Sequence, residues 1–194
     1  NPRGSQGYGE AFCTAIRERW GDLDRKDIEA ALDTALAQNP WLDPTRLGVA
    51  GGSYGGYLTN WLIGHTDRFK AAVSGRCVAD WRGMVGSGDL TWNWMVRAGA
   101  LPWDERDAWY DQQSPIAYAK RITTPLLLEA QEEDHRCPIA QSELVFALVK
   151  AYGRAPVRFV RYPGESHGMS RDGRPWQRVH RLREIAAWFE RYNP

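Results

Sequence analysis

Residues 46–62 read RLGVAGGSYGGYLTNWL, and this stretch decides the fold class. The apolar run at 46–50 predicts a buried strand, and the run at 56–62 predicts the opening of a helix. Between them, residues 51–55 read GGSYG, a G-x-S-x-G pattern. A serine on such a sharp turn needs flanking glycines, because a Cβ there would clash with the neighbouring strand and helix. The context therefore predicts a nucleophile elbow, a strained turn that exposes the hydroxyl of Ser53.

Segments typical of helices and of strands alternate along the rest of the chain. This alternation predicts an α/β fold with a mainly parallel sheet flanked by helices. After the strand at 46–51, further strands are expected at 70–74, 125–130 and 157–162. Apolar stripes predict four helices. The first is capped by Asp24, the second ends near Gly64, the third stops at Gly153, and the last covers 179–189.

The stretch 81–109 holds five of the ten tryptophans and lacks a clean periodicity. We interpret this aromatic area either as a satellite core or as the lining of an apolar pocket. Because the stretch is inserted between two strands, we expect it above the carboxyl ends of the strands, close to Ser53. Trp92 and Trp94 are our candidates for contact with a substrate.

Composition sets the broad class. The 194 residues are 43% hydrophobic and 25% charged, which is typical of one globular domain. A net charge of +1 gives no reason to expect nucleic acid or a membrane surface as a partner. The chain lacks phosphate-binding glycine loops and paired metal-ligand motifs, so we expect no cofactor. Its three cysteines, Cys13, Cys77 and Cys137, form no C-x-x-C pair, which favours the reducing cytoplasm.

Two further polar motifs follow predicted strands. Asp134 lies in EEDHRCP at 132–138, after the strand at 125–130, and His167 lies in YPGESHG at 162–168, after the last strand. The carboxyl ends of parallel strands meet at one edge of the sheet, so these groups should gather near Ser53. The order serine, acid, histidine is that of α/β-hydrolases. We therefore predict Ser53 as nucleophile, His167 as base and Asp134 as the acid, with Glu132 or Glu133 as alternatives to Asp134.

The backbone N–H of Tyr54, the residue after the nucleophile, is the predicted oxyanion donor. A second donor commonly comes from an H-G-G-like loop on an earlier strand, and the sequence holds no such motif. The chain also begins with Asn1 instead of methionine. Together these features suggest a piece of a longer protein.

Four motifs occurring in order resemble the prolyl oligopeptidase family of serine peptidases. They are NPRGS with GYGE at 1–10, GGSYGG at 51–56, DHRCP at 134–138 and SHG at 166–168. The nearest branch is similar to the acylaminoacyl-peptidases. The resemblance implies an α/β-hydrolase fold and the triad roles of Ser53, Asp134 and His167. It also implies that Arg136 binds a substrate carbonyl, whereas the alternative for Arg136 is a surface ion pair with Glu132 or Glu133.

The family pattern extends beyond this chain. Its members carry an N-terminal β-propeller and early strands of the hydrolase sheet, so residues 1–194 would be the C-terminal part of a catalytic domain with an incomplete sheet. Such a sheet has an unpaired edge, which is an aggregation liability. We therefore expect the N-terminal portion of the same enzyme as a partner, and a homo-oligomer.

The resulting hypothesis is hydrolysis of short or N-acylated peptides through an acyl-enzyme. Two alternatives stay open from the sequence. The same triad could serve a carboxylesterase or lipase-like hydrolase, or the chain could be a non-catalytic α/β-hydrolase fragment that acts only when assembled with the missing part.

Overall fold

A four-stranded parallel sheet in the order β1-β2-β3-β4 forms the centre of the molecule. The structure is a computed structural model that describes residues 1–104 and 106–194. The strands are β1 (Gly48–Gly52), β2 (Ala71–Gly75), β3 (Leu126–Gln131) and β4 (Val157–Tyr162). Each begins within two residues of the start expected from the sequence.

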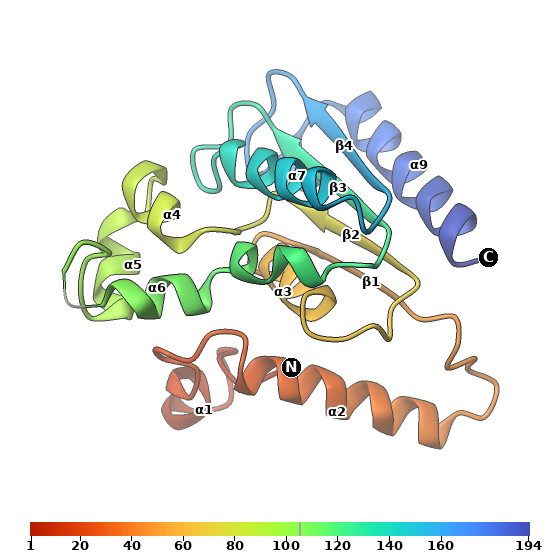
Figure 1. Ribbon diagram of the computed structural model, residues 1–194, viewed down its shortest axis with the longest axis horizontal. Helices are drawn as coiled ribbons and strands as arrows, with labels where there is room; N and C mark the ends of the chain where they lie inside the picture. The colour runs from red at the N-terminus through yellow and green to blue at the C-terminus, as the bar shows by residue number, and fades with distance from the viewer. Residues whose placement is uncertain (105) are drawn as a thin grey trace.

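Helices cover both faces of this sheet (Figure 1). On one face, α3 (Tyr54–Ile63) and α7 (Ala140–Tyr152) pack with Leu126 and Leu128 of β3 in one apolar cluster. On the other face, Leu127 packs with Trp188 of α9 (Pro175–Tyr192). The continuous apolar run of β3 follows from this arrangement, because a strand between two helical layers is buried on both faces.

The remaining helices lie before β1 and around the carboxyl edge of the sheet. They are α1 (Glu10–Thr14), α2 (Leu23–Gln38), α4 (Trp81–Ser87), α5 (Thr91–Ala98), α6 (Asp107–Gln113), the 3₁₀ helix η1 (Pro115–Arg121) and α8 (Met169–Asp172). The expected cap of α2 is wrong by two residues. Asp22 occupies the N-cap position, whereas Asp24 lies inside the helix and is buried.

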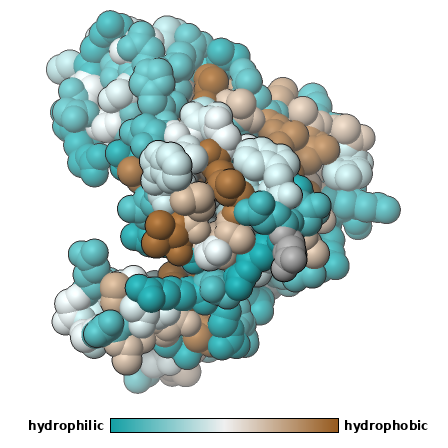
Figure 2. Space-filling view, turned by 90° about the vertical axis from the view of Figure 1, so that its left-hand side faces the viewer, coloured by the Kyte–Doolittle hydropathy of each residue, from teal (hydrophilic) through white to brown (hydrophobic). Residues whose placement is uncertain are grey.

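The tryptophan-rich stretch folds as three short helices, α4 to α6, and not as the irregular segment that its weak periodicity suggested. Trp81 is fully buried and packs against Trp20 and Trp94, with ring centroids 4.2 and 5.0 Å away. Trp92, in contrast, is 76% exposed on α5. It lines a groove of about 620 Å³ between α5 and the N-terminal segment, and Figure 2 shows apolar side chains gathered around a hollow on this side of the molecule.

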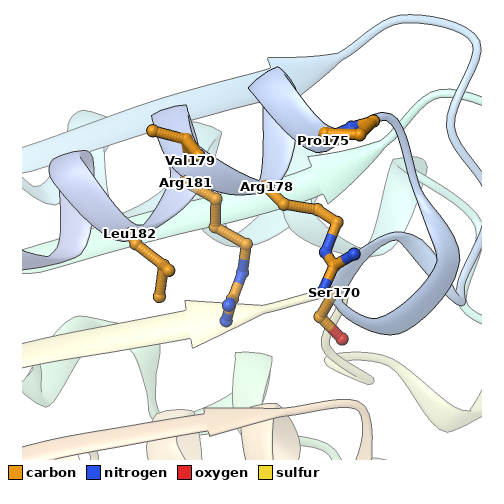
Figure 3. A pocket seen from close by; sticks show the side chains of 6 residues that line it. All are labelled: Ser170, Pro175, Arg178, Val179, Arg181 and Leu182. Carbon is orange, nitrogen blue, oxygen red and sulfur yellow. The ribbon is translucent and has the colours of Figure 1, made fainter.

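β1 forms one edge of the sheet, and Gly48 and Ala50 on it are exposed. Parallel strands are ordinarily buried on both faces, so this edge is unusually open. An apolar hollow of about 310 Å³ lies along the neighbouring helix α9, where Val179 and Leu182 are 48% and 62% exposed. Figure 3 shows the lining side chains of α9, with Arg181 and Leu182 extending from the helix toward the sheet. The described part of the chain thus leaves the apolar side chains of Val179 and Leu182 exposed around this hollow. In that same part, no helix has both the length and the apolar character that crossing a bilayer requires.

β3 also carries a buried carboxylate. Glu129 is 0% exposed, and the Nε of Arg181 lies 3.0 Å from its Oε2, although neither carboxylate oxygen accepts an aligned hydrogen bond. Burial raises the pKa of Glu129 from 4.5 to about 7, against the opposing effect of the Arg181 charge. The folded chain therefore binds this proton more tightly than the unfolded chain does.

We expect Glu129→Gln to stabilise the protein above neutral pH. Between 4.5 and about 7 only the folded state holds the Glu129 proton, so the contribution of this residue to the free energy of unfolding falls as pH rises. Glutamine has no charge to bury, so the variant should melt about 5 °C above the parent at about pH 8. At about pH 5 the two melting temperatures should be equal. Thermal unfolding at both pH values measures the difference, with the exposed Glu190→Gln as control. A variant less stable than the parent at the higher pH would contradict the assignment.

Candidate active site

The turn between β1 and α3 has the strained geometry expected of a nucleophile elbow. Ser53 adopts φ 61° and ψ −121°, a region that L-residues rarely occupy. A Cβ on Gly51 would lie 2.2 Å from the carbonyl oxygen of Gly55, and one on Gly56 would lie 2.7 Å from that of Gly75. The backbone N–H of Ser53 donates to the same Gly75 carbonyl at 2.9 Å. The glycines are therefore required by the close approach of β1, β2 and α3.

Ser53, His167 and Asp134 lie in hydrogen-bond contact in that order. Ser53 Oγ is 3.0 Å from His167 Nε2, and His167 Nδ1 is 2.7 Å from Asp134 Oδ2. The two contacts join residues 114 and 33 positions apart. The topology explains the meeting, because the three residues follow β1, β4 and β3 at the same edge of a parallel sheet.

The backbone fixes the Asp134 carboxylate. Its side chain is 0% exposed, and Oδ1 accepts the N–H groups of Arg136 and Cys137 at 2.9 and 2.8 Å. Oδ2 is thereby left to face the imidazole. Neither alternative acid takes this place, because Glu132 pairs with Arg161 at 2.9 Å and Glu133 is exposed.

Arg76 is a residue of the site that sequence reasoning missed. It directly follows β2, and its Nη1 lies 2.9 Å from His167 Nε2. A guanidinium has only donors, so Nε2 must be the acceptor and the imidazole proton sits on Nδ1, facing Asp134. Arg76 has a positive φ of 39°, and burial lowers the pKa of its guanidinium. Its position after a parallel strand, at the edge that carries Ser53, was the available signal.

Tyr54 opens α3 and is tied to α2. Its hydroxyl donates to Asp24 Oδ2 at 2.6 Å, which accounts for the burial of an acid expected to cap the helix. Burial raises the pKa of Asp24, and burial followed by the Asp24 charge raises the pKa of Tyr54 well above its ordinary value. As a first-turn residue, Tyr54 has a backbone N–H with no partner inside its helix. Its use as an oxyanion donor stays a prediction.

Arg136 lines the same cleft as His167, but it does not form the ion pair expected as its alternative role. Its guanidinium binds the Asp89 carboxylate, with Nη2 at 3.2 Å from Oδ2, and not Glu132 or Glu133. Arg136 and His167 line a common cleft of about 340 Å³. The position of Arg136 is thus compatible with contact to a substrate, and that role stays a prediction.

The two candidate tryptophans are separated by the fold. Trp94 packs against Trp20 and Trp81 in the apolar cluster beneath α4, which matches the satellite-core interpretation. Trp92 lines the groove beside α5, and among residues 1–104 and 106–194 this groove has Asp89 alone in common with the cleft at His167. The side chain of Trp92 is therefore more accessible to a substrate than that of Trp94.

Solved structures establish the class of fold. The acylaminoacyl peptidase of Pyrococcus horikoshii superposes on the whole chain with a TM-score of 0.95 and 35% sequence identity, and the chain covers 31% of that protein. A puromycin hydrolase gives a TM-score of 0.86 at 30% identity, over 99% of this chain and 28% of that one. The parallel sheet with its flanking helices is therefore an α/β-hydrolase fold, and the predicted fold class is confirmed.

The family follows from the sequence comparison. The model of the prolyl oligopeptidase family matches residues 1–193, and the chain belongs to this peptidase family. An uncharacterized peptidase of Bacillus subtilis, YuxL, is 43% identical over 99% of this chain. The acylamino-acid-releasing enzyme of Sus scrofa is 35% identical over 88% of it. The chain spans only 29% and 24% of the lengths of these two relatives.

Proposed function

We propose that this chain carries the active site of a serine peptidase that hydrolyses short or N-acylated peptides. The observation that carries the proposal is the contact series Ser53–His167–Asp134, at 3.0 and 2.7 Å, on the carboxyl edge of the sheet. A hydroxyl, an imidazole and a buried carboxylate in this order form the constellation that activates a serine for acyl transfer.

The reaction proceeds by two acyl transfers. His167 Nε2 takes the Ser53 proton as Oγ attacks the peptide carbonyl, and the Tyr54 N–H stabilises the negative charge on the carbonyl oxygen. The protonated imidazole then gives its proton to the leaving amine, and the acyl group stays on Oγ. Water attacks this ester with His167 again as base, which releases the acid and restores Ser53. Asp134 holds Nδ1–H throughout and stabilises the imidazolium.

The proposed substrate class rests on the relatives. The Sus scrofa protein is named for the release of acylamino acids, and the Pyrococcus horikoshii structure is an acylaminoacyl peptidase. Arg136 supports peptide recognition, because it offers guanidinium donors beside His167 in the same cleft. A cytoplasmic location and a homo-oligomer stay predictions.

We further propose that the chain works as the C-terminal part of a longer enzyme, with an N-terminal portion as its partner. The support is physical. β1 is an open edge of a parallel sheet, and an uncovered hollow with the exposed side chains of Val179 and Leu182 lies along α9. Additional strands and a helix would pair that edge and fill that hollow.

Covalent labelling and a substrate pair test the proposal in the full-length protein. A fluorophosphonate should attach to Ser53, as shown by peptide mass mapping, because labelling demands an assembled nucleophile and base. An N-acetyl-leucine anilide and the matching ester should both be hydrolysed. Turnover of the ester alone would favour the carboxylesterase alternative. Absence of both labelling and turnover would leave the non-catalytic alternative.

A further inference from the structure

We propose that Arg76 is a positioning residue for the base, which keeps His167 Nε2 unprotonated and able to accept the Ser53 proton while the site is empty. This inference rests on the proposed function. Arg76 Nη1 lies 2.9 Å from Nε2, and Ser53 Oγ lies 3.0 Å from the same nitrogen. A hydroxyl and a guanidinium therefore converge on one lone pair.

The contact selects one form of the imidazole. Neutral histidine has two tautomers, and the imidazolium has N–H donors on both nitrogens. Arg76 offers only donors, so it can bond neither the imidazolium nor the tautomer with the proton on Nε2. Asp134 acts on the opposite nitrogen, because its Oδ2 accepts the Nδ1 proton at 2.7 Å. Asp134 alone would also favour the doubly protonated ring, and the positive charge of Arg76 opposes that protonation.

The backbone and its neighbours hold Arg76 in this place. Its φ of 39° is strained for a residue with a side chain, and its N–H donates to the carbonyl oxygen of Glu129 at 2.6 Å. A Cβ on Gly52 would come within 3.3 Å of the guanidinium carbon, so the glycine beside Ser53 leaves space for this group. Strained backbone at such a site is typical of functional positions.

Arg76 is also a half-buried cation, and its charge needs a partner. Across residues 1–104 and 106–194, no Asp or Glu oxygen forms an ion pair with it. Half-buried guanidinium groups are ordinarily paired with acids, because desolvation of a lone charge is costly. The side chain that Arg76 does bind is the imidazole, which indicates that this contact is its role.

Other charges around His167 do not duplicate this effect. Asp134 is bonded to Nδ1, and Asp89 pairs with Arg136 across the cleft. The buried thiol of Cys137 is neutral, since burial raises its pKa to about 12. The remaining ionisable groups that line the cleft are exposed, and they are Glu133, His135, Arg171 and Asp172. Screening by water weakens these exposed charges relative to a guanidinium in direct contact.

The contact must break during turnover. Once Nε2 has taken the Ser53 proton it becomes a donor, and it then repels the N–H groups of Arg76. The guanidinium therefore turns away as the proton arrives, and its contact belongs to the enzyme with an empty site. Its influence should be seen in rates that report on free enzyme, such as kcat/KM and the second-order rate of covalent labelling.

The test is the pH dependence of fluorophosphonate labelling of Ser53 in the full-length protein. In Arg76→Met the midpoint of the acid limb should move up by about one pH unit, because loss of a neighbouring cation favours protonation of the imidazole. Arg76→Lys keeps the charge and should restore the midpoint most of the way. Arg171→Met removes an exposed cation from the same cleft and should move it much less. Arg76→Gln replaces Arg76→Met if that variant does not fold.

The outcomes separate the two proposals. If the midpoint of the acid limb does not move in Arg76→Met, the role of Arg76 is overturned, whatever the labelling rate. The role is also overturned if Arg76→Lys or Arg171→Met moves the midpoint as far as Arg76→Met does. A parent protein that labels with the expected shifts but cleaves no peptide overturns the peptidase proposal and leaves Arg76 as positioning residue. A parent protein that never labels overturns both.

Discussion

Replacement of Ser53 by alanine is expected to lower kcat for hydrolysis of an N-acylated peptide by about 10⁶-fold. Alanine removes the oxygen that lies 3.0 Å from His167 Nε2, so no acyl-enzyme can form. What remains is the far slower attack of water on a bound substrate. The measurement is the steady-state rate in the full-length protein, with fluorophosphonate labelling as a second readout.

The matched control is Ser87→Ala. Ser87 is an exposed serine at the end of α4, and its hydroxyl donates to the carbonyl oxygen of Gly83 in the same helix. That variant should keep the parent rate, and both variants should melt close to the parent. Residual turnover of Ser53→Ala within about tenfold of the parent would remove Ser53 from the role of nucleophile.

Local pattern was enough for the sheet and for the meeting of the three polar groups. The run at 125–130 is apolar because β3 is covered on both faces, and Gly51 and Gly56 are glycines because backbone approaches backbone at these two positions. Asp134 follows β3 and His167 follows β4. Because these strands are parallel, both residues lie at the same edge of the sheet. These inferences need only strand direction and order, which the sequence pattern carries.

Short helices with tryptophans on several sides were harder to predict. The segment 81–98 shows no single apolar stripe, because Trp81 packs inward while Trp92 faces the groove. Two local signals were nevertheless present. The Asp80 carboxylate accepts the N–H groups of Arg82 and Gly83 as a helix cap, and Gly99 ends α5 with a φ of 79°.

The partner of Asp24 and the partner of Arg76 could not be predicted from local rules, since tertiary contacts decide them. Asp22 and Asp24 are both acceptable caps, but Asp24 accepts a hydrogen bond from the hydroxyl of Tyr54, 30 residues away. Arg76 stands in an ordinary turn sequence, and its contact with His167 spans 91 positions. Each role depends on a partner that only the folded sheet edge brings near.

The Asp134→Asn variant is expected to lower kcat by about 10⁴-fold while the fold stays intact. Asparagine has the same shape, and its carbonyl oxygen can keep the N–H groups of Arg136 and Cys137 that now bind Oδ1. Its NH₂ group would then face His167 Nδ1 and donate to it. The imidazole proton would be forced onto Nε2, where it would point at Ser53 Oγ, so that His167 could no longer accept the serine proton.

The control for this variant lies one residue away. Glu133→Gln removes an exposed carboxylate of the same loop and should leave the rate within about twofold, as is usual for screened surface charges. Steady-state rates and melting curves of both variants separate loss of the base from loss of the fold. An Asp134→Asn protein that folds and retains more than about a tenth of the parent rate would show that Asp134 does not set the tautomer. In that case the donor-only contact from Arg76 to Nε2 would suffice to keep His167 in its working form.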